Sequence, residues 1–398
     1  MRRALVVIDG EHYPPVVRDA IAELPYDVVG AWLAGGTEKL RGDADYGVPL
    51  LARLEDGFAE AAVVVDLSDE PVLGPRERFL LAGRVLAAGL RYEGADFHFE
   101  PPQFAAFPVP SLAVIGTGKR VGKTAVTGHV ARLLARDRDV VVVAMGRGGP
   151  AHPVTAEVQP TVETLLELSR AGEHAASDYL ETAALVGVVT IGCRRAGGGL
   201  AGAVTTSNVL QGAAVAAERE PDVVVFDGSG AAIPPIDVDA RILVTGRGHD
   251  AAAYLNGYRV LISDLVVLLG EGDPAAVRRI KDVPVIRADL RLRPTTPLRG
   301  RRVAVFTTGP APIEHLDAEV VAVSRNLADR AKLREDLART DADVFLVEIK
   351  AAAIDVVAEM AETRGAEVIF ADNEVVPRPD EPSLDDAILG LVPTKAPV

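Results

Sequence analysis

The chain has 398 residues and is 48% hydrophobic, so it is long and apolar enough for two or three domains with cores of their own. Its net charge of −15 argues against general nucleic-acid binding, and no apolar run approaches the ~18 residues that span a bilayer. The single cysteine, Cys193, excludes an intrachain disulfide framework, and the N-terminus lacks a signal-peptide pattern, so we expect a cytoplasmic protein that binds neither nucleic acid nor a membrane.

The first block, residues 1–108, alternates between strand-like and helical patterns. The expected strands cover residues 4–8, 27–31 and 61–66, and the expected helices cover residues 15–24 and 76–88. This alternation predicts an N-terminal α/β domain. A proline-rich stretch at residues 99–110 is typical of a linker.

The second block, residues 109–295, starts with an apolar run, a glycine-rich loop and a helical pattern at residues 125–134. The expected strands of this block cover residues 112–115, 140–144, 186–191, 223–226, 241–244 and 265–269. Helices fit between most of these strands, which predicts a mostly parallel, doubly wound sheet. Such sheets bind ligands at the carboxyl ends of their strands, and the motifs described below fall at such ends.

A second boundary is marked by Pro294 and Pro297, and the alternation then resumes in a third block, residues 296–398. Its expected strands cover residues 302–306, 319–322, 344–347 and 367–370, with helices at residues 327–337 and 384–391. The third block is therefore predicted to be a C-terminal α/β domain.

The glycine-rich loop at residues 116–124 has the context of a phosphate-binding loop, because a strand precedes it and a helix follows it. Backbone N–H groups of such a loop surround phosphate oxygens, and the helix N-terminus adds positive potential. The expected ATP-binding residues are Gly116, Thr117, Gly118, Val121, Gly122, Lys123 and Thr124. Lys123 should reach the β- and γ-phosphates, and the Thr124 hydroxyl should hold Mg²⁺. The alternative is an ordinary glycine-rich turn between a strand and a helix.

The first glycine of the motif would normally stand at Thr117, and here it stands one place earlier, at Gly116. The loop resembles in this respect the dethiobiotin-synthetase-like branch of P-loop ligases. The resemblance implies an α/β fold with a central P-loop NTPase domain, flanked here by the N- and C-terminal α/β domains.

Further charged residues complete the predicted catalytic group of Lys123, Lys119, Arg120 and Asp227. Asp227 ends an apolar run and precedes a glycine turn, which is typical of the acidic residue that fixes Mg²⁺ directly or through water. The alternative for Asp227 is a helix cap. Lys119 and Arg120 lie inside the loop, where one of them could stabilise charge on a transferring phosphoryl group.

Two arginine-containing glycine turns indicate a second phosphate site. One turn carries Arg194, Arg195, Gly197 and Gly198, and the other carries Arg147 between glycines. Arginine forks bind phosphate bidentately and bare backbone N–H groups add donors, so these residues are candidates for substrate binding. The alternative is a flexible surface loop with solvated arginines.

Two further clusters are weaker candidates. Asp9, Glu11 and His12 follow the first strand, where they could bind substrate or form a turn capped by aspartate. Asp178 and Glu181 could order water or metal near the site, but solvated helix carboxylates are the simpler interpretation.

Three segments, residues 7–17, 116–124 and 194–199, together resemble the cyclic 2,3-diphosphoglycerate synthetase family, and the resemblance covers essentially the whole chain. It implies a ligase that uses ATP to close an intramolecular pyrophosphate in 2,3-diphosphoglycerate, with ADP and phosphate released. The implied cofactors are ATP and Mg²⁺, and the product of the family is associated with thermoprotection. We also expect a homodimer.

Two other classes of function remain open from the residues. One is another P-loop ligase or small-molecule kinase. The other is a nucleotide-switch NTPase, although no cluster of cysteine or histidine for metal delivery is visible in the sequence.

Overall fold

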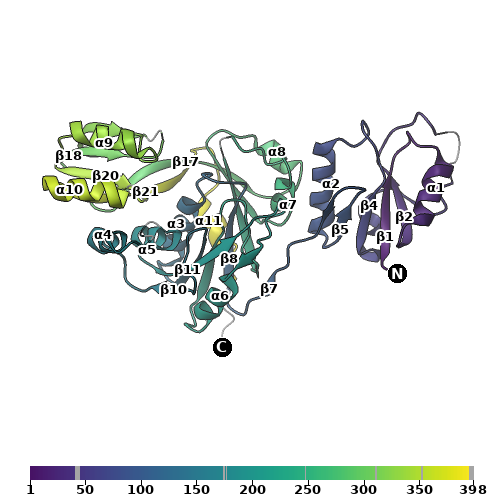
Figure 1. Ribbon diagram of the computed structural model, residues 1–398, viewed down its shortest axis with the longest axis horizontal. Helices are drawn as coiled ribbons and strands as arrows, with labels where there is room; N and C mark the ends of the chain where they lie inside the picture. The colour runs from purple at the N-terminus through teal and green to yellow at the C-terminus, as the bar shows by residue number, and fades with distance from the viewer. Residues whose placement is uncertain are drawn as a thin grey trace.

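The fold is α/β throughout, with three sheets formed by the described strands. The computed structural model describes residues 1–40, 45–173, 175, 177–246, 248–309, 312–350 and 353–393. In Figure 1 the N-terminal domain lies at one end of an elongated molecule, the third block lies at the other, and the central sheet lies between them. Among the described helices, none has the length and apolar character needed to cross a bilayer.

The N-terminal domain contains a six-stranded sheet with the order β3-β2-β1-β4-β5-β6. The elements are β1 (Arg3–Ile8), α1 (Pro14–Glu23), β2 (Asp27–Leu33), β3 (Leu50–Leu51), a 3₁₀ helix (Leu54–Glu60), β4 (Val63–Asp66), α2 (Pro75–Ala87), β5 (Arg91–Glu93) and β6 (His98–Phe99). Both helices α1 and α2 begin at a proline, whose fixed φ suits the first turn and whose missing N–H is not needed there.

The central block supplies most of a 13-stranded sheet. Its elements are β7 (Ala105–Ala106), β8 (Ser111–Gly116), α3 (Lys123–Leu134), β9 (Val140–Gly146), β10 (Val154–Ala156), α4 (Val162–Arg170), α5 (Asp178–Val186), β11 (Val189–Ala196), β12 (Thr206–Ser207), α6 (Val209–Ala217), β13 (Val223–Asp227), β14 (Ile236–Asp237), β15 (Ala240–Gly246), α7 (Asn256–Leu261), β16 (Leu265–Leu269), α8 (Pro274–Arg278) and β17 (Val285–Pro294). Strand β8, which leads into the phosphate loop, pairs in parallel with β13 and β15.

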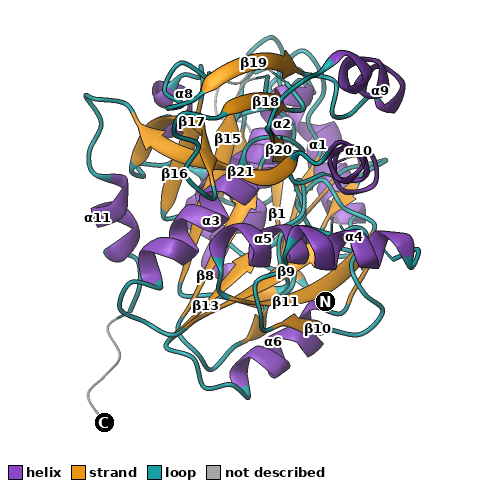
Figure 2. Ribbon diagram, turned by 90° about the vertical axis from the view of Figure 1, so that its left-hand side faces the viewer, coloured by secondary structure: helices purple, strands orange, loops and turns teal. Residues whose placement is uncertain are grey.

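Continuous apolar strands form because helices cover both faces of this sheet. Alternate residues of β9 point to opposite faces: Val140 and Val142 pack in the same core cluster as α3, whereas Val141 and Val143 pack in the cluster of α6. Figure 2 shows α3 and α5 on one side of these strands and α6 on the other. The predicted doubly wound, mostly parallel sheet is confirmed.

The third block continues the central sheet. Its elements are β18 (Arg302–Phe306), β19 (Glu319–Ser324), α9 (Arg330–Arg339), β20 (Val344–Glu348), a π-helix (Ala353–Ala358), α10 (Glu359–Arg364), β21 (Glu367–Pro377) and α11 (Leu384–Leu389). Strand β17 pairs with β16 through Ala288, and from Ala288 to Pro294 it pairs antiparallel with β21. The predicted boundary at residue 295 thus falls directly after β17 in a continuous sheet, and that division of the chain stays a prediction.

Several predicted strands have other bounds, and one of them begins three residues later than expected. The strand expected at residues 186–191 begins at Val189, because α5 runs on to Val186 and ends at Gly187, whose φ of 75° suits a left-handed C-cap. The same strand continues to Ala196, so Arg194 and Arg195 lie at its end and the glycine turn follows them.

Packing of helices joins the three blocks. Helix α2 of the N-terminal domain packs on α7, with an ion pair of 3.0 Å between Arg76 and Asp250. On the other side, Leu165 of α4 and Leu180 of α5 share a core cluster with Phe345 of β20. Figure 1 shows α4 and α5 beneath the third block, so the central block is held between its two neighbours.

A buried carboxylate joins the phosphate-loop helix to β17 and β21. Asp372 pairs with Arg132 of α3 at 2.7 Å and accepts a hydrogen bond from Arg293 of β17 at 3.0 Å, and its side chain is only 4% exposed. Two guanidinium groups around one buried carboxylate hold three elements in a fixed arrangement.

We expect Asp372→Asn to destabilise the protein by about 3 kcal/mol, because it leaves two partly buried guanidinium groups without their anion. The free energy of unfolding in urea would measure this. The control is Asp317→Asn, which alters an ion pair with Arg299 whose side chains are 88% and 74% exposed and should cost below about 0.5 kcal/mol. Equal losses in both variants would contradict a structural role for Asp372.

Candidate active site

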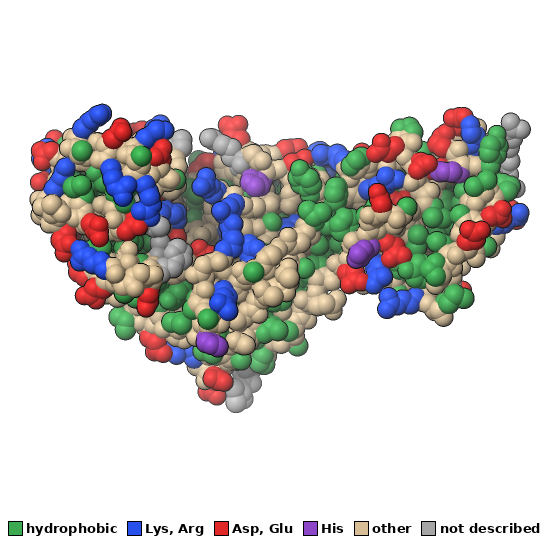
Figure 3. Space-filling view, in the orientation of Figure 1, with side chains coloured by type: hydrophobic (Ala, Val, Ile, Leu, Met, Phe, Trp, Pro, Cys, Tyr) green, Lys and Arg blue, Asp and Glu red, His purple; other side chains and the backbone are tan. Residues whose placement is uncertain are grey.

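A cavity of about 350 Å³ lies beside the phosphate loop, at the carboxyl ends of the central strands. Its walls come from two blocks, with the phosphate loop and α5 on one side and residues of the third block on the other. The lining residues that carry the argument below are Lys119, Arg120, Lys123, Thr124, Arg147, Asp178, Glu181, Glu348 and Lys350. Figure 3 shows the hollow between the third block and the centre of the molecule, with Lys and Arg side chains along it.

Two glycines of the phosphate loop are closely packed. Gly122 has φ of 86°, and a Cβ there would collide with Leu269, so this position requires glycine. Gly118 packs against the ring of His249, which would have to move to make room for a side chain. The loop therefore lies directly against the ends of its neighbouring strands, with its backbone available to a ligand.

Not every predicted loop residue faces the cavity. Residues 118–124 line it, whereas Gly116 ends β8 and Thr117 turns toward β15. Thr117 donates its backbone N–H to the carbonyl of Val244 at 3.1 Å, and its hydroxyl donates to Thr245 at 3.1 Å. Roles of Gly116 and Thr117 in ATP binding stay predictions.

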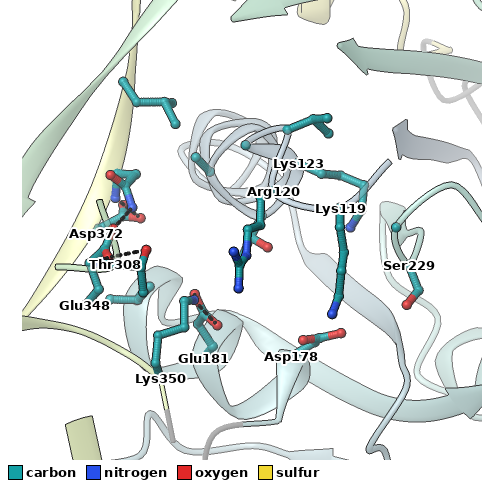
Figure 4. A pocket seen from close by; sticks show the side chains of 18 of the residues that line it. Lys119, Arg120, Lys123, Asp178, Glu181, Ser229, Thr308, Glu348, Lys350 and Asp372 are labelled. Carbon is teal, nitrogen blue, oxygen red and sulfur yellow. Dashed lines mark hydrogen bonds and ion pairs between the residues drawn. The ribbon is translucent and has the colours of Figure 1, made fainter. Parts of the chain in front are cut away.

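Arg120 occupies an unusual backbone conformation within the loop. Its φ of 60° lies in the left-handed region, which costs a non-glycine residue about 1 kcal/mol or more. Figure 4 shows its side chain extending into the cavity toward Glu181, while Lys119 extends toward Asp178. The loop thus directs two cations into the space next to the expected phosphate position.

Lys123 and Asp227 form an ion pair at the base of the loop. The Lys123 Nζ donates to Asp227 Oδ1 at 2.6 Å, and the Thr127 hydroxyl donates to the same oxygen at 2.9 Å. Burial raises the pKa of Asp227, and the charge of Lys123 opposes that rise. Asp227 is 2% exposed and lies behind Lys123, outside the cavity wall, so its predicted metal role needs Lys123 to turn toward phosphate.

The oxygen donors at the loop fit Mg²⁺. Among the described residues, no group of three or more His, Cys, Asp or Glu side chains could hold a metal. Mg²⁺ in phosphate sites takes one or two protein oxygens together with phosphate oxygens and water, for which the Thr124 hydroxyl and the Asp227 carboxylate are the right chemical type. The arrangement is compatible with a metal brought in with the nucleotide.

A second cavity of about 540 Å³ adjoins the first at Arg147. Arg147 lines both cavities, and the second is lined also by Arg194, Arg195 and the side chains of His152 and Asn208. All three arginines predicted from the glycine turns are therefore brought together by the parallel strands β9 and β11. Gly197 and Gly198 lie next to this cavity rather than in its wall, and their role stays a prediction.

Arg195 is fixed by the backbone, whereas the Arg194 guanidinium has no hydrogen-bond or ion-pair partner among the described residues. Arg195 donates to the carbonyl of Ser229 at 2.8 Å and to the carbonyl of Gly197 at 2.5 Å. Burial and the nearby charge of Arg147 lower the pKa of Arg195. The backbone of Arg194 donates to Asn208 Oδ1 at 2.6 Å, which orients the strand end without occupying the side chain.

The two cavities concentrate unpaired positive charge. Among the described residues, the side chains of Lys119, Arg120, Arg147 and Arg194 have no carboxylate within 4.0 Å. Asp178 and Glu181 line the first cavity as well, but the cations that form no ion pair repel one another, and an anion between them would relieve that repulsion. The site is therefore suited to several phosphate groups.

Asp9, Glu11 and His12 lie in the N-terminal domain and line neither cavity. Asp9 is fully buried and accepts hydrogen bonds from the backbone of Glu11, His12 and Asp69. These bonds lower the pKa of Asp9 against the effect of burial. The cluster orders the loop after β1, and its predicted part in substrate binding stays a prediction.

Several cavity residues were missed by sequence reasoning. Thr308, Glu348, Lys350 and Asn373 come from the third block, which carries no recognisable motif. Glu181 was expected to be solvated, but its side chain is only 13% exposed and its carboxylate binds Lys350. A local pattern could not reveal this pair because its members are 169 residues apart.

A buried arginine supports the turns that follow β11 and β13. Arg259 of α7 is 2% exposed and donates to the carbonyl of Ala231 at 2.6 and 3.0 Å and to the carbonyl of Leu200 at 3.0 Å. Burial lowers its pKa to about 10. Arg259 thereby ties the turn after β13 to the glycine turn after β11.

Comparison with known protein families gives three matches along the chain. Residues 111–290 match the family model described as cyclic 2,3-diphosphoglycerate synthetase, P-loop domain. Residues 3–100 match the N-terminal domain of the same family, and residues 294–374 match its C-terminal domain.

Relatives with the name cyclic 2,3-diphosphoglycerate synthetase align over nearly the full length. One from Rubrobacter xylanophilus is 49% identical, with 98% of this chain and 97% of the relative covered. One from Thermococcus kodakarensis is 43% identical over 94% of each. One from Methanothermobacter thermautotrophicus is 38% identical, over 98% of this chain and 95% of the relative.

We expect Lys123→Ala to lower turnover with ATP by about a hundredfold or more, because it removes a charged contact to phosphate from a water-poor site. Initial rates of ADP release measure this. Lys332→Ala is the matched control, since Lys332 is an exposed lysine paired with Asp329 on α9. Near-normal turnover of the Lys123 variant would exclude this loop from catalysis.

Asp227→Asn should reduce activity steeply and raise the Mg²⁺ concentration needed for half-maximal rate, because the amide keeps the shape but loses the charge. Titration of activity with Mg²⁺ is the measurement. Asp264→Asn serves as control, since Asp264 precedes β16 at the opposite edge of the sheet and accepts a hydrogen bond from the backbone of Arg241. An unchanged Mg²⁺ requirement would leave Asp227 only a structural role.

Proposed function

Since this chain belongs to the cyclic 2,3-diphosphoglycerate synthetase family, we propose that it uses ATP to close an intramolecular phosphoric anhydride in 2,3-diphosphoglycerate. The products would be cyclic 2,3-diphosphoglycerate, ADP and phosphate. The observation that carries the proposal is the joining of two cavities at Arg147, one beside the phosphate loop and one beside Arg194 and Arg195. Adjacent sites for a nucleotide and a small polyanion are what this reaction needs.

The chemistry requires two mutually repelling phosphates to be joined. In the sequence of steps that we favour, an oxygen of one substrate phosphate attacks the γ-phosphorus of ATP, and the bond from that phosphorus to ADP breaks. An oxygen of the second substrate phosphate then attacks the phosphorus of the first, and the transferred group leaves as inorganic phosphate. Each step moves phosphoryl groups between oxygens, so no protein nucleophile is needed.

The chain's own residues suit these steps. Lys123 would leave Asp227 for the nucleotide phosphates, and Lys119 and Arg120 would stabilise charge around the transferring group. Arg147, which lines both cavities, would contact anions in both, and Arg194 would hold the far phosphate of the substrate. Mg²⁺, held by Thr124 and Asp227, would offset the charge of the nucleotide when bound.

Phosphorus NMR of the purified protein with ATP, Mg²⁺ and 2,3-diphosphoglycerate tests the proposal. The expected result is a cyclic anhydride signal with equal amounts of ADP and phosphate. A stable phosphorylated product without free phosphate would indicate a kinase instead. ADP and phosphate formed at the same rate without substrate would indicate an NTPase, and either result contradicts the proposal.

Arg194→Ala should raise the dissociation constant for 2,3-diphosphoglycerate about tenfold to a hundredfold, the range of one charge-assisted hydrogen bond. ATP-analogue affinity should change only slightly, because the loop and its lysine remain. Calorimetric titration of each ligand decides this. Arg219→Ala, which removes an exposed pair with Glu157, is the control. Equal losses for both ligands would assign Arg194 to the nucleotide.

A further inference from the structure

The third block contributes one cation to the nucleotide cavity. Lys350 is the second residue after the end of β20, and its side chain extends to the cavity across from Arg120, as Figure 4 shows. The Lys350 Nζ donates to Glu181 Oε1 at 2.9 Å and to Oε2 at 3.0 Å. Glu181 belongs to α5 of the central block, so the pair crosses the cavity between two blocks.

The geometry of the pair leaves Lys350 able to bind a second anion. An ammonium has three N–H donors, and two of them point at Glu181. The third has no acceptor among the described residues, and the side chain is 42% exposed while Glu181 is 13% exposed. Both side chains line the cavity, and the lysine is the more exposed of the two.

The neighbouring carboxylate of Glu348 does not compete for this lysine. Glu348 Oε2 accepts from the backbone N–H of Thr308 at 2.8 Å and from its hydroxyl at 3.1 Å, and Oε1 accepts from Asn373 at 3.0 Å. Both oxygens are engaged on the far wall. Burial opposes the charge of Lys350, but attraction to Glu181, with smaller contributions from Glu348 and Asp178, raises its pKa, so that it stays charged.

We propose that Lys350 is a phosphate-binding residue of the nucleotide cavity, held in place by Glu181 and supplied by the third block. Glu181 is then a positioning residue. The ligand is a phosphoryl group, either the γ-phosphate of ATP or a phosphate of the small substrate. If the ligand is a phosphate of the small substrate, this inference rests on the proposed function. If the ligand is the γ-phosphate of ATP, the inference rests only on the phosphate loop.

The lysine resembles Lys123 in its arrangement. Both lysines are paired with a largely buried carboxylate, and both line the same cavity beside unpaired arginines. A cation held by a single carboxylate is pre-positioned, so little side-chain freedom is lost when phosphate arrives. The simpler alternative is a salt bridge that only joins the third block to α5.

The experiment compares Lys350→Met with Lys332→Met, which removes an exposed lysine of the same block paired with Asp329. Calorimetric titrations in Mg²⁺ would use a non-hydrolysable ATP analogue, ADP, and 2,3-diphosphoglycerate in the presence of ADP. We expect Lys350→Met to weaken the triphosphate analogue or the diphosphoglycerate about tenfold or more, with ADP and the control variant nearly unchanged. Thermal unfolding of both variants is recorded in parallel.

The pattern of affinity losses identifies the phosphate that Lys350 contacts. A loss confined to the triphosphate analogue supports a γ-phosphate contact, and a loss confined to diphosphoglycerate supports a substrate contact. No loss, or an equal loss for ADP together with a lowered unfolding temperature, overturns the proposal in favour of a salt bridge alone. Glu181→Gln should weaken the same ligand less than Lys350→Met does, because it loosens the lysine without removing it.

These titrations do not depend on cyclisation. If phosphorus NMR shows no cyclic product with the unaltered protein, the proposed reaction is excluded. The effect of Lys350 on binding of the ATP analogue could still be measured. Conversely, normal cyclisation and normal ligand affinity in Lys350→Met would exclude only the proposed role of Lys350 and would leave the proposed reaction in place.

Discussion

The antiparallel pairing of β17 with β21 is the constraint on which the site depends. Strand β17 is long enough to complete the parallel central sheet and then to pair with a strand from the end of the chain. This register carries β20 and its following residues to the edge where the phosphate loop lies, so two blocks face each other across one cavity. The buried Asp372, between Arg132 and Arg293, fixes the helix of the phosphate loop against the same two strands.

The cationic side chains of the site are of two kinds. Lys123 and Lys350 are each held by a carboxylate, which keeps them ordered without ligand. Arg120, Arg147 and Arg194 have no such partner among the described residues, and their mutual repulsion favours a polyanion between them. A protein with a net charge of −15 thus presents a local concentration of cations where its strands end, which matters more for ligand binding than the overall charge.

The N-terminal domain contacts the central block through the packing of helices rather than through a shared sheet. Helix α2 packs on α7, and the buried Arg259 of α7 holds the carbonyls of Ala231 and Leu200 beside the second cavity. On the same side, His249 packs on Gly118 of the phosphate loop while its neighbour Asp250 pairs with Arg76 of α2. The N-terminal domain therefore contacts the elements that support the loops of both cavities, although Asp9 and His12 themselves line neither cavity.

The sequence by itself determined the phosphate loop with Lys123 and Thr124, the apolar parallel strands and the arginines at the ends of β9 and β11, because each depends on contiguous residues and on the short-range geometry of a strand end. It did not indicate β17 as a strand shared by two blocks, since charged residues such as Arg287, Asp289 and Arg291 interrupt its apolar pattern. Only the tertiary structure decided that Glu181 is largely buried rather than solvated and that Lys350 reaches it. The contact joins residues 169 positions apart, and its formation depends on strand register and on the packing of the third block, which no local pattern encodes.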